Sequence, residues 1–153
     1  MVSDAETMRY IGDGSTTDLA GARRAIGNWL ARWEQSGIGH FVAERRDDGR
    51  FVGRVGFLVW DSETWTVSEL HDRSEVELGW TLARSQWGNG YATEAARALL
   101  GWTDRPRLIS LIQHGNERSA RVAERIGERY ERDVVVRGMP TRLFAIDRTT
   151  ASR

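Results

Sequence analysis

The sequence contains no cysteine and no lysine, so all 22 of its Lys+Arg residues are arginine. Without cysteine the chain can form no disulfide, no thiolate metal site and no cysteine nucleophile. No apolar run approaches the roughly 20 residues of a membrane-spanning helix, and the first ten residues lack the charged-then-apolar plan of a signal peptide. The formal net charge is +0 at pH 7, which implies no general attraction to nucleic acid or to an anionic membrane. These absences favour a cytoplasmic protein.

The residues that are present suffice for one hydrophobic core. The chain has 153 residues, of which 40% are hydrophobic and 7 are tryptophan, as is typical of one globular domain. We expect a single domain over 1–153, with an irregular stretch at 1–14 and a frayed tail at 148–153. The histidines at 40, 71 and 114 are scattered without metal-ligand spacing, so no metal site is predicted.

The stretch 74–97 carries the clearest local signal. Residues 75–82 alternate polar and apolar side chains, the period of a half-buried strand. Trp87-Gly88-Asn89-Gly90 breaks that period, and from Ala92 the apolar residues recur at helical spacing. A helix that begins after glycines presents unpaired N–H groups and a positive dipole end. The stretch predicts an anion site, most naturally for phosphate, although a glycine turn that only joins strand to helix is the alternative.

The rest of the chain predicts further helices and strands. One helix begins at 16–18, with hydroxyls to cap it and a carboxylate in its first turn, and is ended by Gly37 and Gly39. It carries one apolar face that we expect to pack on the core: Leu19, Ala22, Ile26, Trp29, Leu30 and Trp33. Another helix is capped by Asn116 and stopped by Gly127. The other expected strands lie at 40–44, 50–60, 107–113, 130–137 and 141–147, with a polar loop at 61–73. The strand–helix–strand unit in the middle implies a parallel pair.

Two blocks of sequence resemble the GCN5-related N-acetyltransferase (GNAT) superfamily. WGNGYATEA at 87–95 is similar to its pyrophosphate loop, Gln/Arg-x-x-Gly-x-Gly/Ala, with Trp87 where Gln or Arg is usual. Tryptophan is common there in the branch that acetylates ribosomal-protein N-termini, and RLISLIQHGNERSARVAERIGERYERD at 107–133 is similar to that branch too. The resemblance covers about 5–148 and implies a mixed α/β fold, in which a central mixed sheet with splayed parallel strands is flanked by helices.

The resemblance also implies that one part is missing. Family members usually open with a strand and part of a helix before a stretch like 4–12, where this chain begins. We therefore expect a fold that lacks the usual first strand. An uncovered sheet edge invites a partner strand, so a homodimer is a further hypothesis.

The co-substrate implied by the resemblance is acetyl-CoA, without a metal. The loop would hold the diphosphate through main-chain N–H groups, which a side chain at either glycine would obstruct. The pantetheine arm would pair with the strand where two parallel strands splay apart. Asn116 would meet the arm, or serve only as a helix cap. The residues so assigned are Trp80, Thr81, Leu82, Trp87, Gly88, Asn89, Gly90, Tyr91, Ala92, Thr93 and Asn116.

Two residues are the catalytic candidates. Many family members carry a tyrosine acid seven residues after the asparagine, but Ala123 stands there, so the resemblance makes Ser119 the candidate donor to the leaving thiolate. A plain helix-surface serine is the alternative. Glu77 stands where the family often places a carboxylate near the acceptor amine. Glu75 points to the same face, and a carboxylate pair could raise one pKa, unless both face solvent.

The acceptor is the least determined part. Trp29, Trp33, His71 and Glu75 are the candidate substrate contacts, with core packing as the alternative for the tryptophans and an exposed loop for His71. The expected function is acetyl transfer to a primary amine by direct attack, with a protein N-terminal α-amine as the first candidate. A small amine such as an aminoglycoside or polyamine, or a non-catalytic acyl-CoA-binding module, are the alternatives.

Overall fold

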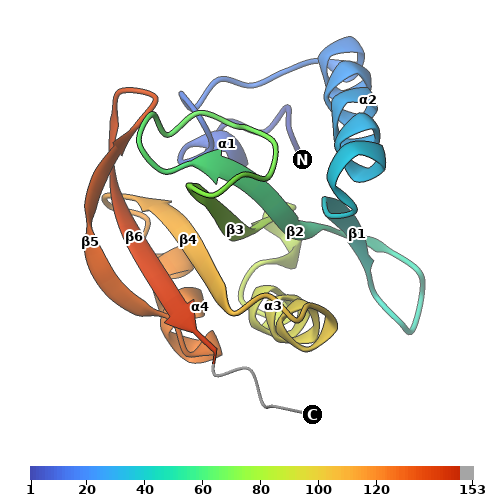
Figure 1. Cartoon of the computed structure of the whole chain (residues 1–153). Helices are drawn as coiled ribbons and strands as arrows, with labels where there is room; N and C mark the ends of the chain where they lie inside the picture. The colour runs from blue at the N-terminus through green and yellow to red at the C-terminus, as the bar shows by residue number, and fades with distance from the viewer. Residues whose placement is uncertain (149–153) are drawn as a thin grey trace.

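The computed structural model describes residues 1–148, so that all of the expected tail except Arg148 lies outside the described residues. Figure 1 shows the elements in their arrangement. In chain order they are α1 (Ala5–Met8), α2 (Leu19–Ser36), β1 (His40–Glu44), β2 (Phe51–Asp61), β3 (Ser74–Leu82), a 3₁₀ turn (Arg84–Gln86), α3 (Tyr91–Trp102), β4 (Arg107–Gln113), α4 (Glu117–Ile126), β5 (Arg129–Val136) and β6 (Met139–Asp147).

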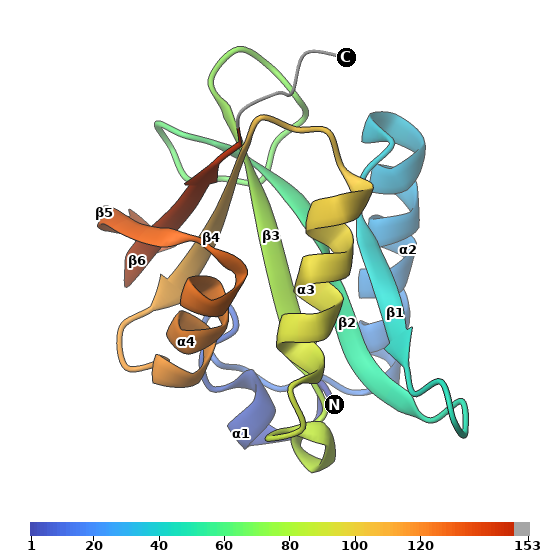
Figure 2. The ribbon, with the colours of Figure 1, turned by 90° about the horizontal axis from the view of Figure 1, so that it is seen from below.

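The strands form one mixed sheet of six, in the order β1-β2-β3-β4-β6-β5. Strands β3 and β4 are parallel, and each other neighbouring pair is antiparallel. Helices α3 and α4 cover one face, while α2 and the loop after β2 lie over the other face (Figures 1 and 2). This architecture confirms the expected mixed α/β fold.

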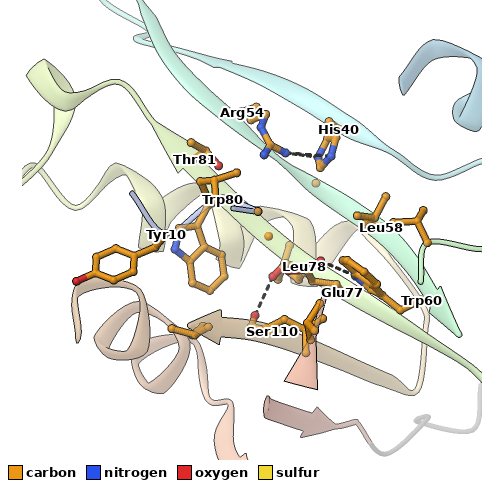
Figure 3. Close-up of a pocket in the computed structure, with 18 of the residues that line it drawn as sticks. Tyr10, His40, Arg54, Leu58, Trp60, Glu77, Leu78, Trp80, Thr81 and Ser110 are labelled. Atoms are coloured by element: carbon orange, nitrogen blue, oxygen red, sulfur yellow. Dashed lines mark hydrogen bonds between the residues drawn. The ribbon is translucent and has the colours of Figure 1, made fainter. Parts of the chain in front are cut away.

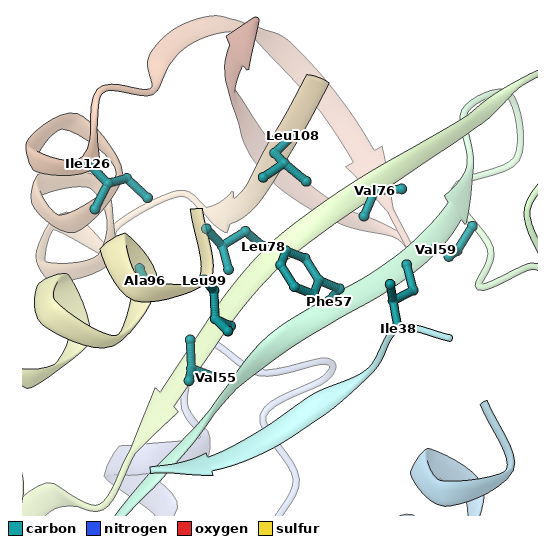
Figure 4. Close-up of a cluster of buried hydrophobic side chains, with 10 residues drawn as sticks. All are labelled: Ile38, Val55, Phe57, Val59, Val76, Leu78, Ala96, Leu99, Leu108 and Ile126. Atoms are coloured by element: carbon teal, nitrogen blue, oxygen red, sulfur yellow. The ribbon is translucent and has the colours of Figure 1, made fainter. Parts of the chain in front are cut away.

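The main core lies between the sheet and the helices α3 and α4 (Figure 4). Leu78 of β3, Leu108 of β4 and Ala96 of α3 are fully buried there. A second cluster, which includes Trp60, Trp65 and Ile109, lies on the opposite face. Each large aliphatic or aromatic side chain buried in this way contributes roughly 1.5–3 kcal/mol. The sheet is therefore fixed from both sides and can position a site at its centre.

The parallel pair at the centre of the sheet is split. Strand β3 pairs with β2 along its full length to Leu82, but with β4 it forms a single ladder pair, Glu77 with Ile109. Figure 2 shows the two strands meeting at one end and parting toward the end near α1. Inside the split, the Ser110 hydroxyl donates a 2.7 Å hydrogen bond to the Leu78 carbonyl. The expected splaying of two parallel strands is present, and it leaves one edge of β3 open beyond Leu78.

The long helix α2 has the predicted ends but not the predicted buried face. The Asp18 side chain accepts a hydrogen bond from the Gly21 N–H at 2.8 Å, and Gly37 ends the helix with φ of 68°. Leu19, Ile26 and Leu30 are 66%, 49% and 59% exposed, so the prediction that they pack on the core is wrong. The helix contacts the sheet through its two tryptophans. The periodicity of a sequence shows which residues share a helix face, but it does not show how much of that face the sheet covers.

Two other element boundaries differ from those predicted from the sequence. The N-terminal stretch is not wholly irregular, because the Asp4 side chain accepts from the Thr7 N–H at 2.7 Å and caps α1. The last hairpin turns over two residues, Arg137 and Gly138, whose φ angles are 52° and 81°. Such a turn needs positive φ at both central positions. Strand β6 therefore begins at Met139, two residues before the predicted start.

Candidate functional site

Two cavities adjoin at the split between β3 and β4. We call the one on the α2 side of the sheet the inner cavity, with a volume of about 350 Å³, and the one beside the N-terminus of α3 the loop cavity, with a volume of about 330 Å³. Six residues line both cavities: Tyr10, Ile11, Trp80, Thr81, Asn116 and Ser119. A molecule bound in one cavity can therefore meet a molecule bound in the other at this junction.

The loop cavity has the features of an anion site. The first backbone bond into α3 runs from the Glu94 N–H to the Gly90 carbonyl, so the N–H groups at 91–93 have no partner within the helix. Gly88 and Gly90 adopt φ of 79° and 80°, and nothing lies within 4 Å of the position that a Cβ would take at either. The open space and the positive helix end leave the backbone accessible to a phosphate.

Side chains of the loop hold it in place. The Trp87 indole donates to the Leu82 carbonyl at 2.9 Å, which ties the loop to the end of β3. The Asn89 amide donates to the Gln86 and Trp87 carbonyls, both at 3.2 Å. Asn89 does not line the cavity, so its part is to brace the loop. The other loop residues that the sequence assigned to the co-substrate do line the cavity: Trp87, Gly88, Gly90, Tyr91, Ala92 and Thr93.

A row of arginines on α4 also faces the loop cavity, and the sequence analysis missed it. Arg118, Arg121 and Arg125 line the cavity together with the loop. The Arg118 guanidinium lies 3.8 Å from the centre of the Trp87 ring and 3.6 Å from the Glu6 carboxylate. Their spacing of three and four residues places them on one side of a helix, which could have been read from the sequence. These cations add to the attraction of the loop for a polyanion.

The junction contains the second helix cap and the candidate acid. The Asn116 side chain accepts from the Ser119 N–H at 3.3 Å and caps α4, which places both residues where the cavities meet. Ala123 is fully buried, so the position where the family usually has tyrosine belongs to the core here. Ser119 is thus the α4 hydroxyl that lines the junction.

Glu77 lies in the inner cavity on the β3 face opposite the main core (Figure 3). The Trp60 indole donates to its carboxylate at 2.7 Å. Burial raises the pKa of Glu77, even though the Trp60 hydrogen bond and the positive charge of Arg54 act to lower it. A carboxylate whose pKa is raised toward neutrality is suited to accept a proton from an amine.

Glu75 does not form the expected pair with Glu77. Arg107 binds the Glu75 carboxylate, with its Nε atom 3.1 Å from Oε2, and the same guanidinium binds Glu131 and Asp147. Glu75 lines neither cavity. The carboxylate pair that the sequence left open is not formed, because residues far away in the sequence hold one member while burial acts on the other.

His40 and Arg54 form a pair on the far side of the inner cavity from Glu77 (Figure 3). Burial and then the charge of Arg54 lower the pKa of His40 to about 3, so the imidazole is neutral. The Arg54 guanidinium donates to His40 Nε2 at 3.0 Å and lies 5.0 Å from the Trp29 ring centre. The sequence analysis missed this pair, although an arginine inside the apolar strand 51–60 was a visible signal.

Of the remaining candidate substrate contacts, one lines the inner cavity and two do not. Trp29 lines the inner cavity. Trp33 does not, because its indole donates to the His40 carbonyl at 3.1 Å and packs against Phe41. His71 also lies outside both cavities, in the loop after β2, with Nε2 3.3 Å from the Asp61 carboxylate. Of the four expected contacts, the structure places only Trp29 in the inner cavity.

The fold and the loop agree with a known family. The family model for the acetyltransferase (GNAT) domain matches residues 1–129. The chain belongs to the GNAT acetyltransferase family. The matched part of this GNAT chain contains the loop cavity and Glu77, and it ends before the β5–β6 turn.

Individual proteins similar to this chain share less than half of their residues with it over the matched parts. YkkB of Bacillus subtilis (strain 168) is 39% identical over 112 residues, which cover 70% of this chain and 60% of that protein. The uncharacterized N-acetyltransferase p20 of Bacillus licheniformis is 28% identical over 102 residues, which cover 65% of this chain and 51% of that protein. The chain thus spans 60% or less of these curated relatives. The crystal structure of an acetyltransferase from Agrobacterium tumefaciens (strain C58) matches with a TM-score of 0.70 and 29% identity, covering 90% of this chain and 77% of that one.

The structure also bears on membranes and metals. No helix within residues 1–148 is both long and apolar enough to cross a membrane. Over the same residues, no three His, Asp or Glu side chains are grouped as metal ligands.

Proposed function

We propose that the chain transfers an acetyl group from acetyl-CoA to the primary amine of an acceptor by direct attack. The observation that carries this proposal is the junction, where six residues line both the anion-binding loop cavity and the inner cavity with Glu77. A thioester held from one side and an amine held from the other would meet there. Holding two reactants in contact supplies a large part of the rate enhancement of such reactions.

The loop cavity is suited to acetyl-CoA, which supplies an activated acyl group. The free N–H groups at 91–93 would bind the diphosphate, and the arginines of α4 would neutralise part of its charge. The open edge of β3 at Trp80, Thr81 and Leu82 would pair with the amides of the pantetheine arm. These contacts would direct the thioester from the loop cavity toward the junction.

Glu77 would accept a proton from the acceptor amine, and Ser119 would stabilise the negative charge on the departing sulfur. Glu77 takes a proton from the acceptor ammonium, and the free amine attacks the thioester carbonyl. A C–N bond forms and the C–S bond breaks, while the Ser119 hydroxyl donates a hydrogen bond to the departing thiolate. The second proton of the attacking nitrogen passes to this thiolate, so that the products are the amide and the CoA thiol. An α-amine, with an ordinary pKa near 8, gives up its proton to such a base more easily than a lysine near 10.4. This difference favours an N-terminal or other α-amine over a lysine.

Replacing the proposed base tests this mechanism. We expect Glu77→Gln to lower kcat/KM by about 10²–10⁴ in a CoA-thiol release assay. Its pH profile should move upward, because the reaction then depends on amine that is already deprotonated. The acetyl-CoA affinity measured by calorimetry should stay nearly unchanged.

A neighbouring glutamate provides the matched control. Glu75→Gln changes a residue of the same strand that lies outside both cavities, and it should leave the pH profile as in the wild type. An unaltered profile for Glu77→Gln removes Glu77 from the mechanism. Tight acetyl-CoA binding without turnover on any peptide or small amine points instead to a non-catalytic acyl-CoA-binding module.

A further inference from the structure

The charges that line the inner cavity are unbalanced. Three arginines from three different elements face it, Arg32 of α2, Arg54 of β2 and Arg137 at the β5–β6 turn. Glu77 is the only carboxylate among its lining residues, and the half-buried His40 is neutral. A cavity that takes an acceptor amine would be expected to carry negative charge, so the excess of arginine calls for a second charged group on the acceptor.

Arg54 is the best placed of the three cations. Arg54, Gly56, Leu58 and Trp60 occupy every second position of β2 and so lie on the same face of the strand. All four line the inner cavity, so the Arg54 side chain points into it. Its guanidinium lies between His40 and the Trp29 ring. A guanidinium has five N–H donors, and the neutral His40 occupies only part of them. The remaining donors are available to a planar anion, which they can bind in a bidentate manner.

None of the three arginines forms an ion pair in the described part of the protein. Within residues 1–148, no carboxylate lies within 4.0 Å of the guanidinium of Arg32, Arg54 or Arg137. Glu77 is held instead by the Trp60 indole, over whose ring the Arg137 guanidinium lies at 5.4 Å. Burial lowers the pKa of Arg54, whereas Arg137 is exposed to water. A guanidinium removed from water without a close anionic partner is costly, so the bound acceptor is the natural source of the anion that Arg54 lacks.

The cavity therefore has a negative pole and a positive pole. Figure 3 shows Glu77 with Trp60 on one side and Arg54 with His40 on the other. From this geometry we infer that the acceptor carries a carboxylate close to its primary amine, with the amine at Glu77 and the carboxylate at Arg54. The carboxylate is that of a free amino acid or an acidic side chain at the start of a peptide. The inference rests on the proposed acetyl transfer in this cavity, and it disfavours aminoglycosides and polyamines, whose several positive charges the three arginines repel.

Matched acceptors test the inference. Alanine is compared with alaninamide, and a peptide amide that begins with Asp is compared with one that begins with Asn, in a CoA-thiol release assay with spermidine as the polycationic reference. In at least one pair we expect the carboxylate member to have a kcat/KM about tenfold higher or more, and spermidine to be the poorest acceptor. The pair that shows the difference identifies the source of the carboxylate. A preference for the neutral members or for spermidine overturns the inference and leaves the proposed acetyl transfer in place.

Variants of Arg54 locate the preference. Arg54→Gln should abolish the difference between the paired acceptors, mainly through a higher KM for the carboxylate member. Arg54→Lys should keep part of the preference, because the charge remains but the two-pronged donor is lost. Arg50→Gln, at an exposed arginine outside the cavity just before β2, is the matched control and should behave as the wild type. An equal loss for both members in Arg54→Gln, in protein that melts as the wild type does, contradicts the inference.

Failure of the proposed function gives a different result. If no acceptor is acetylated although CoA binds, the proposed transfer is wrong, and binding then decides the inference. Alanine and alaninamide are titrated against CoA-loaded wild type and Arg54→Gln by nuclear magnetic resonance. Selective, Arg54-dependent binding of alanine supports the carboxylate site, and equal binding of both compounds by both proteins rejects it.

Discussion

At the scale of single residues, burial rather than identity sets the chemistry of the charged side chains. Glu75 and Glu77 are the same residue type two positions apart, yet one is held in an arginine network and the other in a cavity. The pKa of Glu77 is raised because the sheet desolvates it. In the same way, burial depresses the pKa of His40 and leaves the imidazole free to accept from Arg54.

Glu128 is another buried glutamate, and it lies outside both cavities. It comes after Gly127, the residue that ends α4, is 2% exposed, and neither of its carboxylate oxygens has a hydrogen-bond partner within the described chain. Burial raises its pKa to about 8; the neighbouring Ser110 hydroxyl acts against this shift, and the negative charge of Glu77 acts with it. The folded protein therefore holds a proton at Glu128 that the unfolded chain releases above its ordinary pKa.

This proton makes stability depend on pH. Because the folded pKa of about 8 lies above the ordinary value of 4.5, the free energy of unfolding should fall as pH rises between these two values, by roughly 4–5 kcal/mol in total. Glu128→Gln should remove this fall and be more stable than the wild type at pH 8. Denaturant unfolding of both proteins at several pH values measures the difference.

The comparison between the two proteins separates Glu128 from other titrating groups. His40 acts in the opposite sense, since its folded pKa of about 3 lies below 6.5, so that its contribution to stability is lost as pH falls through this range. It is present in both proteins and cancels in the difference. Glu124→Gln on the exposed side of α4 is the control, and it should keep the wild-type pH dependence. A Glu128→Gln profile parallel to that of the wild type contradicts the assigned role.

At the scale of secondary-structure elements, local sequence signals predicted where helices and strands begin and end, but they did not predict which helix face is buried. The period change between 82 and 92, the Asn116 cap, and the glycine stops at 37 and 127 were predicted and are confirmed. The start of α2 was predicted, but its cap is the Asp18 carboxylate and not the expected hydroxyl. These features depend on neighbours a few residues away. The exposed apolar residues of α2 show the limit of such signals, because the burial of a helix face depends on which other elements pack against it.

The start of α3 offers a direct test at this scale. Gly90→Val places a branched side chain at a φ of 80° and next to the free N–H groups of the first helical turn. We expect it to weaken CoA binding about tenfold or more, measured by calorimetry. Gly101→Ala, near the other end of the same helix and with open space around it, should leave CoA binding unchanged and the melting temperature equal or higher. Equal CoA affinity in Gly90→Val and wild type would remove the loop from the site.

At the scale of the whole molecule, the site exists because the sheet splits. The single ladder pair between β3 and β4 opens the space that both cavities share, and elements from most of the chain line it. Tyr10 comes from the N-terminal segment, which is fastened across the split end by a 2.6 Å hydrogen bond from the Gln113 side chain to the Gly12 carbonyl. The cavities are therefore a property of the assembled sheet and of no single motif.

The homodimer expected from the sequence stays a prediction. Strand β1 lies at one end of the sheet and pairs only with β2, and its Val42 side chain is 67% exposed. An edge of this kind can accept a partner strand. Light scattering at two concentrations tenfold apart should give a mass above that of the monomer at the higher one, and Val42→Lys should reduce it. A constant monomer mass in the wild type rejects the dimer.

The sequence by itself determined the strand–loop–helix beside the loop cavity, the Asn116 cap and the mixed fold, because periodicity, glycine conformation and capping act between neighbouring residues. Only the tertiary structure decided that Glu77 is held by Trp60, that Arg54 meets His40 and Trp29, and that Glu128 is buried without a partner. Each of these environments is built from residues far apart in the sequence. The desolvation and the charges that set their chemistry arise only when the sheet brings those residues together.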